Sequence, residues 1–239
     1  MIIALLWIGL LCSNAPKASA AAIVFTFDNI NRSIPDDSPL GLSDPRDVST
    51  PFTMILNVTI SLTISGDFNG DLYVQVTHGS GFSVLLNRVG RTSLNEFGYG
   101  DSGMDITLSD DAAAGDVHVY RTTLFGNENT PVAGMLTGVW APDARIIDPD
   151  VVLNTDSRSA TLSSFKRPGP EWNVDALHCR CQRRRAEHAE KLVRERGGGS
   201  RAEFRRAARC GFVVALLPAE SASMGAARRR SSSHSRFSA

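Results

Sequence analysis

Cysteine is scarce in this sequence and is missing from its central part. The 239 residues contain four cysteines, and none of them lies between residues 21 and 165. Disulfide bonds are therefore excluded for this stretch, which has to fold without them. The C-terminal cysteines lie near histidines, but their C-x-C spacing fits no standard zinc pattern, and we expect no zinc site there. The histidines and cysteines that could be drawn as such a site are His178, Cys179, Cys181, His188 and Cys210.

Apolar runs long enough to span a bilayer are also missing, because a membrane-spanning helix needs about 20 apolar residues. The longest run, IIALLWIGLLC at residues 2–12, is shorter, and Ala18-Ser19-Ala20 follows it as a cleavage pattern. This layout predicts a signal peptide over residues 1–20, export of the protein to the cell surface or the medium, and no stable membrane span after cleavage. No lysine or arginine precedes the run, and an uncleaved anchor is the alternative.

The sequence lacks a net charge, but this balance hides two oppositely charged parts. Residues 1–165 carry 18 acidic and 8 basic residues, whereas residues 166–239 carry 7 acidic and 17 basic residues. We therefore predict a folded domain over residues 22–165 and a basic tail of low order over residues 166–239. The arginine runs of the tail could bind nucleic acid through charge, but an exported chain has little use for that partner, and disorder is the preferred interpretation.

The central part alternates apolar and polar residues in short segments, which is typical of half-buried strands. The longest is Leu56–Ile64, and an Asn69-Gly70 turn separates it from Leu72–Thr77, which predicts a hairpin. No internal repeat and no helical periodicity of useful length are present. Because turn residues separate all these segments, we predict an all-β sandwich of the jelly-roll type. The other predicted strands are Val24–Phe27, Phe82–Leu86, Met104–Leu108, Val117–Thr122 and Gly138–Trp140.

Catalytic motifs are nearly absent. Gly100-Asp101-Ser102-Gly103 repeats the string around the nucleophile of chymotrypsin-like proteases, but a serine nucleophile needs a histidine base and an orienting acid. The only histidine upstream is His78, in a predicted turn, and no G-x-S-x-G elbow occurs. We therefore expect the GDSG string to be a structural loop and expect no catalytic residues in this chain.

Carboxylates gather in the predicted turns, and calcium binds oxygen ligands from such loops. No EF-hand or repeat spacing is present, and solvated turn acids explain the pattern more simply. Calcium is therefore a weak candidate, and no other cofactor is expected. The candidate calcium ligands are Asp67, Asp71, Asp101 and Asp105.

Several segments resemble one protein family. Ile34-Pro35-Asp36-Asp37, the stretch Ile64–Gly90, the run Phe97–Ala112 and the segment Gly138–Ser164 are similar to the P (Homo B) domain of subtilisin-like proprotein convertases, in its exported bacterial branch. The resemblance covers residues 24–165, with His78-Gly79 in place of the usual Ser-Pro. It implies a jelly-roll sandwich that packs on a subtilisin-like catalytic domain and supports its folding. Serine-type endopeptidase activity is thus implied by association only.

The resemblance stops at Phe165, and the genetic code suggests why. If one extra nucleotide lies near the Lys166 codon, the restored frame can read N-G-L-D-P-N-G-T-W-T-L-F-I-A-D, which is similar to the end of a P domain. We therefore predict that the tail comes from a shifted reading frame. A tail of this kind would leave the sandwich without its last strands and with an unpaired edge, and the chain would fold poorly.

Two other functions remain open at this point. A free-standing carbohydrate-binding or surface-binding β module would need exposed aromatic side chains, for which Trp140 and Tyr73 are the candidates. A surface-attached structural protein of bacteria is the other alternative, and Phe212–Leu217 with Arg228–Arg230 faintly resembles a sorting signal.

Overall fold

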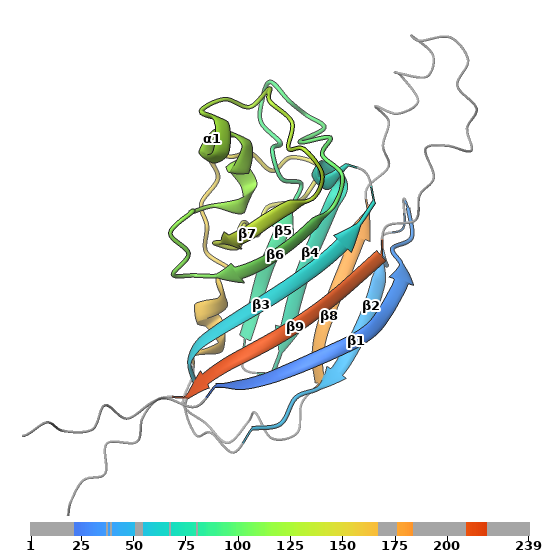
Figure 1. The fold of residues 1–239 in the computed structure, drawn as a ribbon, viewed down its shortest axis with the longest axis vertical. Helices are drawn as coiled ribbons and strands as arrows, with labels where there is room; N and C mark the ends of the chain where they lie inside the picture. The colour runs from blue at the N-terminus through green and yellow to red at the C-terminus, as the bar shows by residue number, and fades with distance from the viewer. Residues whose placement is uncertain are drawn as a thin grey trace, which may run out of the picture. The chain divides into compact units, whose positions relative to one another are not determined.

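The alternating segments form two sheets in a computed structural model (Figure 1). The structure describes residues 22–36, 38, 40–50, 55–66, 68–79, 81–166, 176–183 and 209–218, all within one compact unit, residues 20–219. One sheet has five strands in the order β1-β9-β3-β6-β7, and the other has four in the order β2-β8-β4-β5. The strands are β1 (Ile23–Ser33), β2 (Leu42–Asp47), β3 (Ile55–Ser65), β4 (Leu72–His78), β5 (Gly81–Asn87), β6 (Met104–Ser109), β7 (Leu136–Trp140), β8 (Ala176–Arg183) and β9 (Arg209–Pro218). The predicted all-β class is confirmed.

Alternation along β3 and β4 explains how the two sheets share one core. On β3 every second residue from Val58 onward is buried, and β4 shows the same period along its whole length. Side chains of both sheets then belong to a single buried cluster. Each fully buried aliphatic side chain stabilises the fold by about 1.5–3 kcal/mol. The members from these two strands are Val58, Ile60, Leu62, Ile64, Leu72, Val74 and Val76.

The predicted hairpin between β3 and β4 is wrong, because the two strands belong to different sheets. β3 pairs with β6 and β9, whereas β4 pairs with β5 and β8. The Asn-Gly pair lies in a single 3-10 turn, η1 (Asn69–Asp71), which the backbone of residues 99–101 holds through Gly70 N to Tyr99 O at 2.8 Å. A Cβ on Gly70 would lie 2.6 Å from Tyr99 N, so this close approach requires glycine. The predicted strand Phe82–Leu86 is confirmed as part of β5, which pairs with β4 in an antiparallel hairpin.

The predicted strand at Val117–Thr122 is also wrong. This segment forms η2 (Val117–Val119) and the short helix α1 (Tyr120–Phe125), which ends at Gly126 with a φ of 70°. Asp116 starts the helical turn, because its side chain accepts a hydrogen bond from His118 N. In the described part of the chain no helix is both long and apolar enough for a membrane crossing. The predicted signal peptide lies outside the described residues.

A returning segment covers the outer edge of β5. Val84 N donates to Ala160 O, and the N–H groups of Asp143 and Ala144 donate to the carbonyls of β5. The Oγ of Ser164, in η3 (Leu162–Phe165), donates to Phe82 O at 2.7 Å. Residues 143–165 therefore protect an edge that would otherwise be open to another chain.

The prediction that the tail leaves the sandwich without its last strands is wrong for two segments. β9 lies between β1 and β3 and is antiparallel to both, and β8 lies between β2 and β4 in the other sheet (Figure 1). Two β9 residues, Val214 and Leu216, are buried in the core. The physical reason is that both sequences suit strands: Arg209–Pro218 holds a run of apolar residues, and Ala176–Arg183 alternates apolar and polar residues. The rest of the tail, residues 167–175, 184–208 and 219–239, lies outside the described residues.

Candidate functional site

Asp101 of the GDSG string is a buried anchor point. Its carboxylate accepts hydrogen bonds from Tyr120 Oη at 2.6 Å, from Arg121 Nε and Nη2 at 2.8 and 2.7 Å, and from Val132 N at 3.0 Å. Burial alone would raise the pKa of Asp101, but these donors and the charge of Arg121 outweigh it and lower the pKa below its ordinary value. The carboxylate is therefore ionised and fully engaged near neutral pH.

Tyr120, which donates to Asp101, is held in place by further contacts on its oxygen and its ring. Asn69 Nδ2 donates to the Tyr120 oxygen at 3.3 Å, and the ring packs edge to face on Tyr99 and Trp140 at centroid distances of 4.8 and 6.3 Å. Burial and the Asp101 hydrogen bond raise the pKa of Tyr120 far above its ordinary value. The phenol is thus a permanent donor, and the Asp101 cluster is a structural clamp.

The clamp fixes a long excursion of the chain between η2 and β7. Tyr120 and Arg121 hold its start, Val132 holds its far end, and Arg121 Nη1 donates to Glu128 O in the middle at 3.1 Å. One buried carboxylate therefore holds both ends of residues 120–132. We name this segment the clamped excursion.

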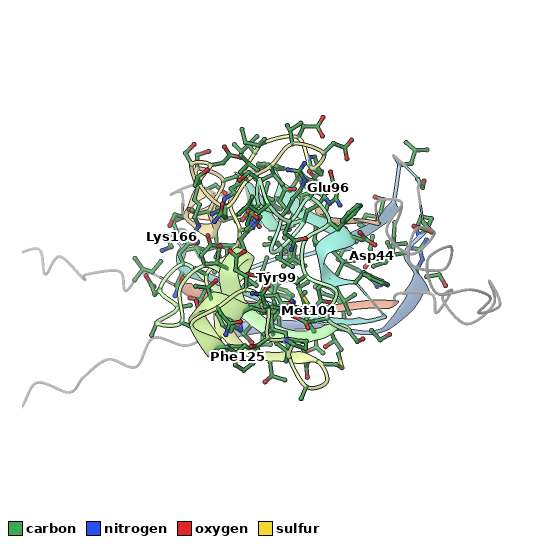
Figure 2. The ribbon with its side chains drawn as sticks, turned by 90° about the horizontal axis from the view of Figure 1, so that it is seen from above. Asp44, Glu96, Tyr99, Met104, Phe125 and Lys166 are labelled. Atoms are coloured by element: carbon green, nitrogen blue, oxygen red, sulfur yellow. The ribbon has the colours of Figure 1, made fainter. Side chains whose placement is uncertain are left out.

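The clamped excursion and the adjoining strand β7 display apolar side chains to solvent. Leu124 and Phe125 lie on α1, Met135 precedes β7, and Val139 lies on it, each at least 37% exposed. Figure 2 shows Phe125 away from the interior, where Tyr99 and Met104 lie. Single exposed apolar residues are ordinary on protein surfaces. Four of them lie between residues 124 and 139, on α1 and on or next to β7. We name these four the apolar rim and take them as a candidate interaction surface: Leu124, Phe125, Met135 and Val139.

Neither aromatic candidate for carbohydrate stacking is well placed. Trp140 is buried, and its Nε1 donates to Thr137 O at 2.9 Å. Tyr73 is half-buried and donates to Gln75 Oε1 at 3.0 Å. The alternative of a carbohydrate-binding module therefore gains no support from these two residues.

A second cluster of buried charges surrounds His118. Its Nδ1 lies 2.7 Å from Asp143 Oδ2, and its Nε2 lies 2.9 Å from Arg91 O. Arg145 bridges Asp143 and Asp116, at 3.1 and 2.7 Å. The cluster joins residues far apart in the sequence, and none of them formed a recognisable motif. A histidine paired with an aspartate belongs to catalytic triads, but here Nε2 faces a main-chain carbonyl where a triad would place a nucleophile's hydroxyl.

The GDSG string does not assemble a serine protease site. Ser102 is exposed in the loop before β6, Asp101 is occupied by the clamp, and His78 is buried at the end of β4 in the other sheet. The structure therefore places the string in a structural loop, in which Asp101 binds the side chains of Tyr120 and Arg121.

The candidate calcium ligands are dispersed among different contacts. Asp71 is buried in η1, with Oδ1 4.0 Å from Arg88 Nη2, and exposed Asp105 accepts from Thr63 Oγ1 at 3.0 Å. A cation at Asp101 would have to displace the Arg121 guanidinium, and Asp67 lies outside the described residues. Over the described ranges, no group of three or more acidic, histidine or cysteine side chains is arranged to hold a metal ion.

The C-terminal cysteines belong to two different sheets. His178, Cys179 and Cys181 lie on β8, Cys210 lies on β9, and His188 lies outside the described residues.

Comparison of the chain with protein-family models, with curated proteins and with solved structures finds no match. The resemblance to P domains therefore stays a prediction, and the function has to be argued from the clamp and the apolar rim.

Proposed function

We propose that this chain is an exported accessory domain that packs against a subtilisin-like catalytic domain and stabilises it, with a jelly-roll sandwich of the P-domain type. The observation that carries the proposal is the clamped excursion, in which one buried carboxylate holds the segment that presents Leu124 and Phe125 to solvent. A fixed apolar surface costs little conformational entropy when it binds, and this favours docking. The proposed partner supplies the catalytic residues, so the chain itself acts by binding.

The test uses a purified subtilisin-like catalytic domain, measured with and without this chain. We expect the intact chain to raise the melting temperature of the catalytic domain and to bind it in titration calorimetry. The double variant Leu124→Ser with Phe125→Ser should weaken binding at least tenfold, because each apolar side chain contributes about 1.5–3 kcal/mol when buried. The chain alone should not hydrolyse a peptide substrate.

Leu94→Ser is the matched control, since Leu94 is 97% exposed but lies on a different loop. This variant should bind the catalytic domain as the unmodified chain does. Equal loss of binding in both variants would contradict the assignment of the apolar rim. Absence of any binding or stabilisation by the unmodified chain would contradict the proposed function itself.

A further inference from the structure

His118 occupies a buried position in which both of its ring nitrogens face oxygen acceptors. Nδ1 faces the carboxylate of Asp143 at 2.7 Å, and Nε2 faces the main-chain carbonyl of Arg91 at 2.9 Å. The histidine and the aspartate are completely buried. Neither oxygen can donate a hydrogen bond, so both bonds require a proton on the histidine ring.

Only the doubly protonated ring satisfies this geometry. A neutral imidazole carries one N–H, and its other nitrogen presents a lone pair. If the neutral ring keeps its bond to Asp143, the lone pair of Nε2 faces the lone pairs of Arg91 O. If it keeps the bond to Arg91 O, the lone pair of Nδ1 faces a carboxylate. One contact is therefore repulsive whenever the ring loses its proton.

The two contacts join three segments of the chain. Arg91 lies in the loop of residues 88–98 that follows β5, and Asp143 lies in the segment that covers the β5 edge. The same loop is tied to His118 by Gly90 N, which donates to His118 O at 2.7 Å. The Arg91 guanidinium donates to the carbonyls of Asp150 and Val152, each at 2.6 Å. His118 thus lies at the junction where the loop meets the rest of the sandwich.

We propose that the protonated ring of His118 latches the loop of residues 88–98 to the sandwich and that loss of this proton loosens the loop. The device is a pH-sensitive latch, and it does not depend on the docking proposal. Its two states differ by one hydrogen bond, from Nε2 to Arg91 O, which is present when the ring is charged and becomes repulsive when the ring is neutral. The carboxylate of Asp143 keeps the remaining N–H.

The charged groups around the ring set the direction of its titration. Burial lowers the pKa of His118, but the hydrogen bond and charge of Asp143 and the bond to Arg91 O raise it, and the net pKa lies above the ordinary value of 6.5. The positive charge of Arg145 opposes this rise. Asp116 pairs with Arg145 at 2.7 Å and lies 3.6 Å from Arg158 Nε, so it partly offsets the arginine charge.

The pH dependence of the latch follows from the direction of this pKa shift. A raised pKa means that the latch contributes fully below the open-state pKa of about 6.5 and is lost as the pH rises through the higher value of the closed state. The equilibrium constant for loop closing therefore falls as the pH rises between the two values, by at most about tenfold for each pH unit, and levels off above them. The latch is closed in mildly acidic surroundings and loose in alkaline ones.

The test measures amide hydrogen exchange of the full chain by NMR between pH 6 and 9, with each rate divided by the intrinsic rate at that pH. Protection of the Gly90 and Arg91 amides should fall as the pH rises, by at most about tenfold per pH unit, and then level off. The ¹⁵N shifts of the His118 ring should show two N–H groups at pH 6 and one after protection has fallen.

His118→Gln should remove the pH dependence of protection in this loop, because glutamine does not titrate in this range. His78→Gln is the matched control, since His78 is also a buried histidine and lies in β4, in the four-stranded sheet. That variant should keep the fall of loop protection with rising pH. A neutral His118 ring at pH 6, or protection that is constant across the range, would overturn the proposal. Both observations use the unmodified chain and decide the matter even if His118→Gln does not fold.

Discussion

A chain that ends at Lys166 is expected to show no cooperative unfolding, whereas the full chain unfolds in a single transition. The truncation removes β8 and β9, which are interior strands of the two sheets. Among the described strands, β1 pairs only with β9 and β2 pairs only with β8. Both N-terminal strands would therefore lose their partners, and the inner edges of β3 and β4 would be exposed.

The free energy of stabilisation lost with β8 and β9 is large compared with the stability of a domain. Val214 and Leu216 alone contribute about 1.5–3 kcal/mol each, and the core side chains on the detached strands add to this. Domains of ordinary size are stable by only about 5–15 kcal/mol. Thermal scans followed by near-ultraviolet circular dichroism will measure the transition.

The matched control is a chain that ends at Pro218. It keeps both tail strands and removes only residues 219–239, so it should unfold as the full chain does. A Lys166-terminated chain that unfolds cooperatively near the same temperature would show that β8 and β9 do not complete the sheets.

Asp101→Ala is expected to lower the free energy of unfolding by about 3–5 kcal/mol, because it leaves the buried donors of Tyr120 and Arg121 without their acceptor. Urea denaturation will measure this change. Asp105→Ala is the control, since Asp105 is exposed and accepts one hydrogen bond, from Thr63. It should cost less than about 1 kcal/mol. Equal costs for the two variants would contradict the clamp.

The same carboxylate should make the fold sensitive to acid. Because the pKa of Asp101 lies below its ordinary value of 3.8, its contribution is complete above pH 3.8 and is lost as the pH falls through the lower value. Asp101→Ala should therefore remove part of the acid-induced loss of stability. Urea titrations of both proteins between pH 2 and 7 provide the measurement.

Local patterns in the sequence were sufficient to predict most strands of the central part. Alternation located β3, β4 and β6 to within one or two residues, because their side chains face the core on one side only. The strand β2 was missed, since Leu42–Asp47 contains Pro45 and two aspartates, which are rare in strands. Pairing was harder to predict, because the Asn69-Gly70 pair is held by residues 99–101, about 30 positions away.

The tail strands were missed for a different reason. Ala176–Arg183 alternates Leu177, Cys179 and Cys181 with polar residues, and Arg209–Pro218 contains a continuous apolar run. Both patterns are compatible with strands, but the shifted-frame interpretation led us to expect disorder. The shifted frame itself is a statement about the coding DNA and stays a prediction.

The candidate site was only partly predictable. The GDSG string drew attention to Asp101, but as part of a protease motif or a calcium site, and only the fold shows its bonds to Tyr120 and Arg121. His118 and Asp143 are 25 positions apart and meet because two loops pack together. Contacts of this kind depend on the assembled sandwich, so a single sequence without its fold does not reveal them.

Hydrogen exchange of β9 in the full chain tests most directly the central claim, that the tail completes the two sheets. If β9 lies between β1 and β3, the amides of Arg209–Leu217 should exchange as slowly as those of Ile55–Ser65, with which they form one ladder. Exchange of the β9 amides at the rate of an unstructured peptide, while β3 stays protected, would contradict the account and would return these residues to the disordered tail that the sequence predicted.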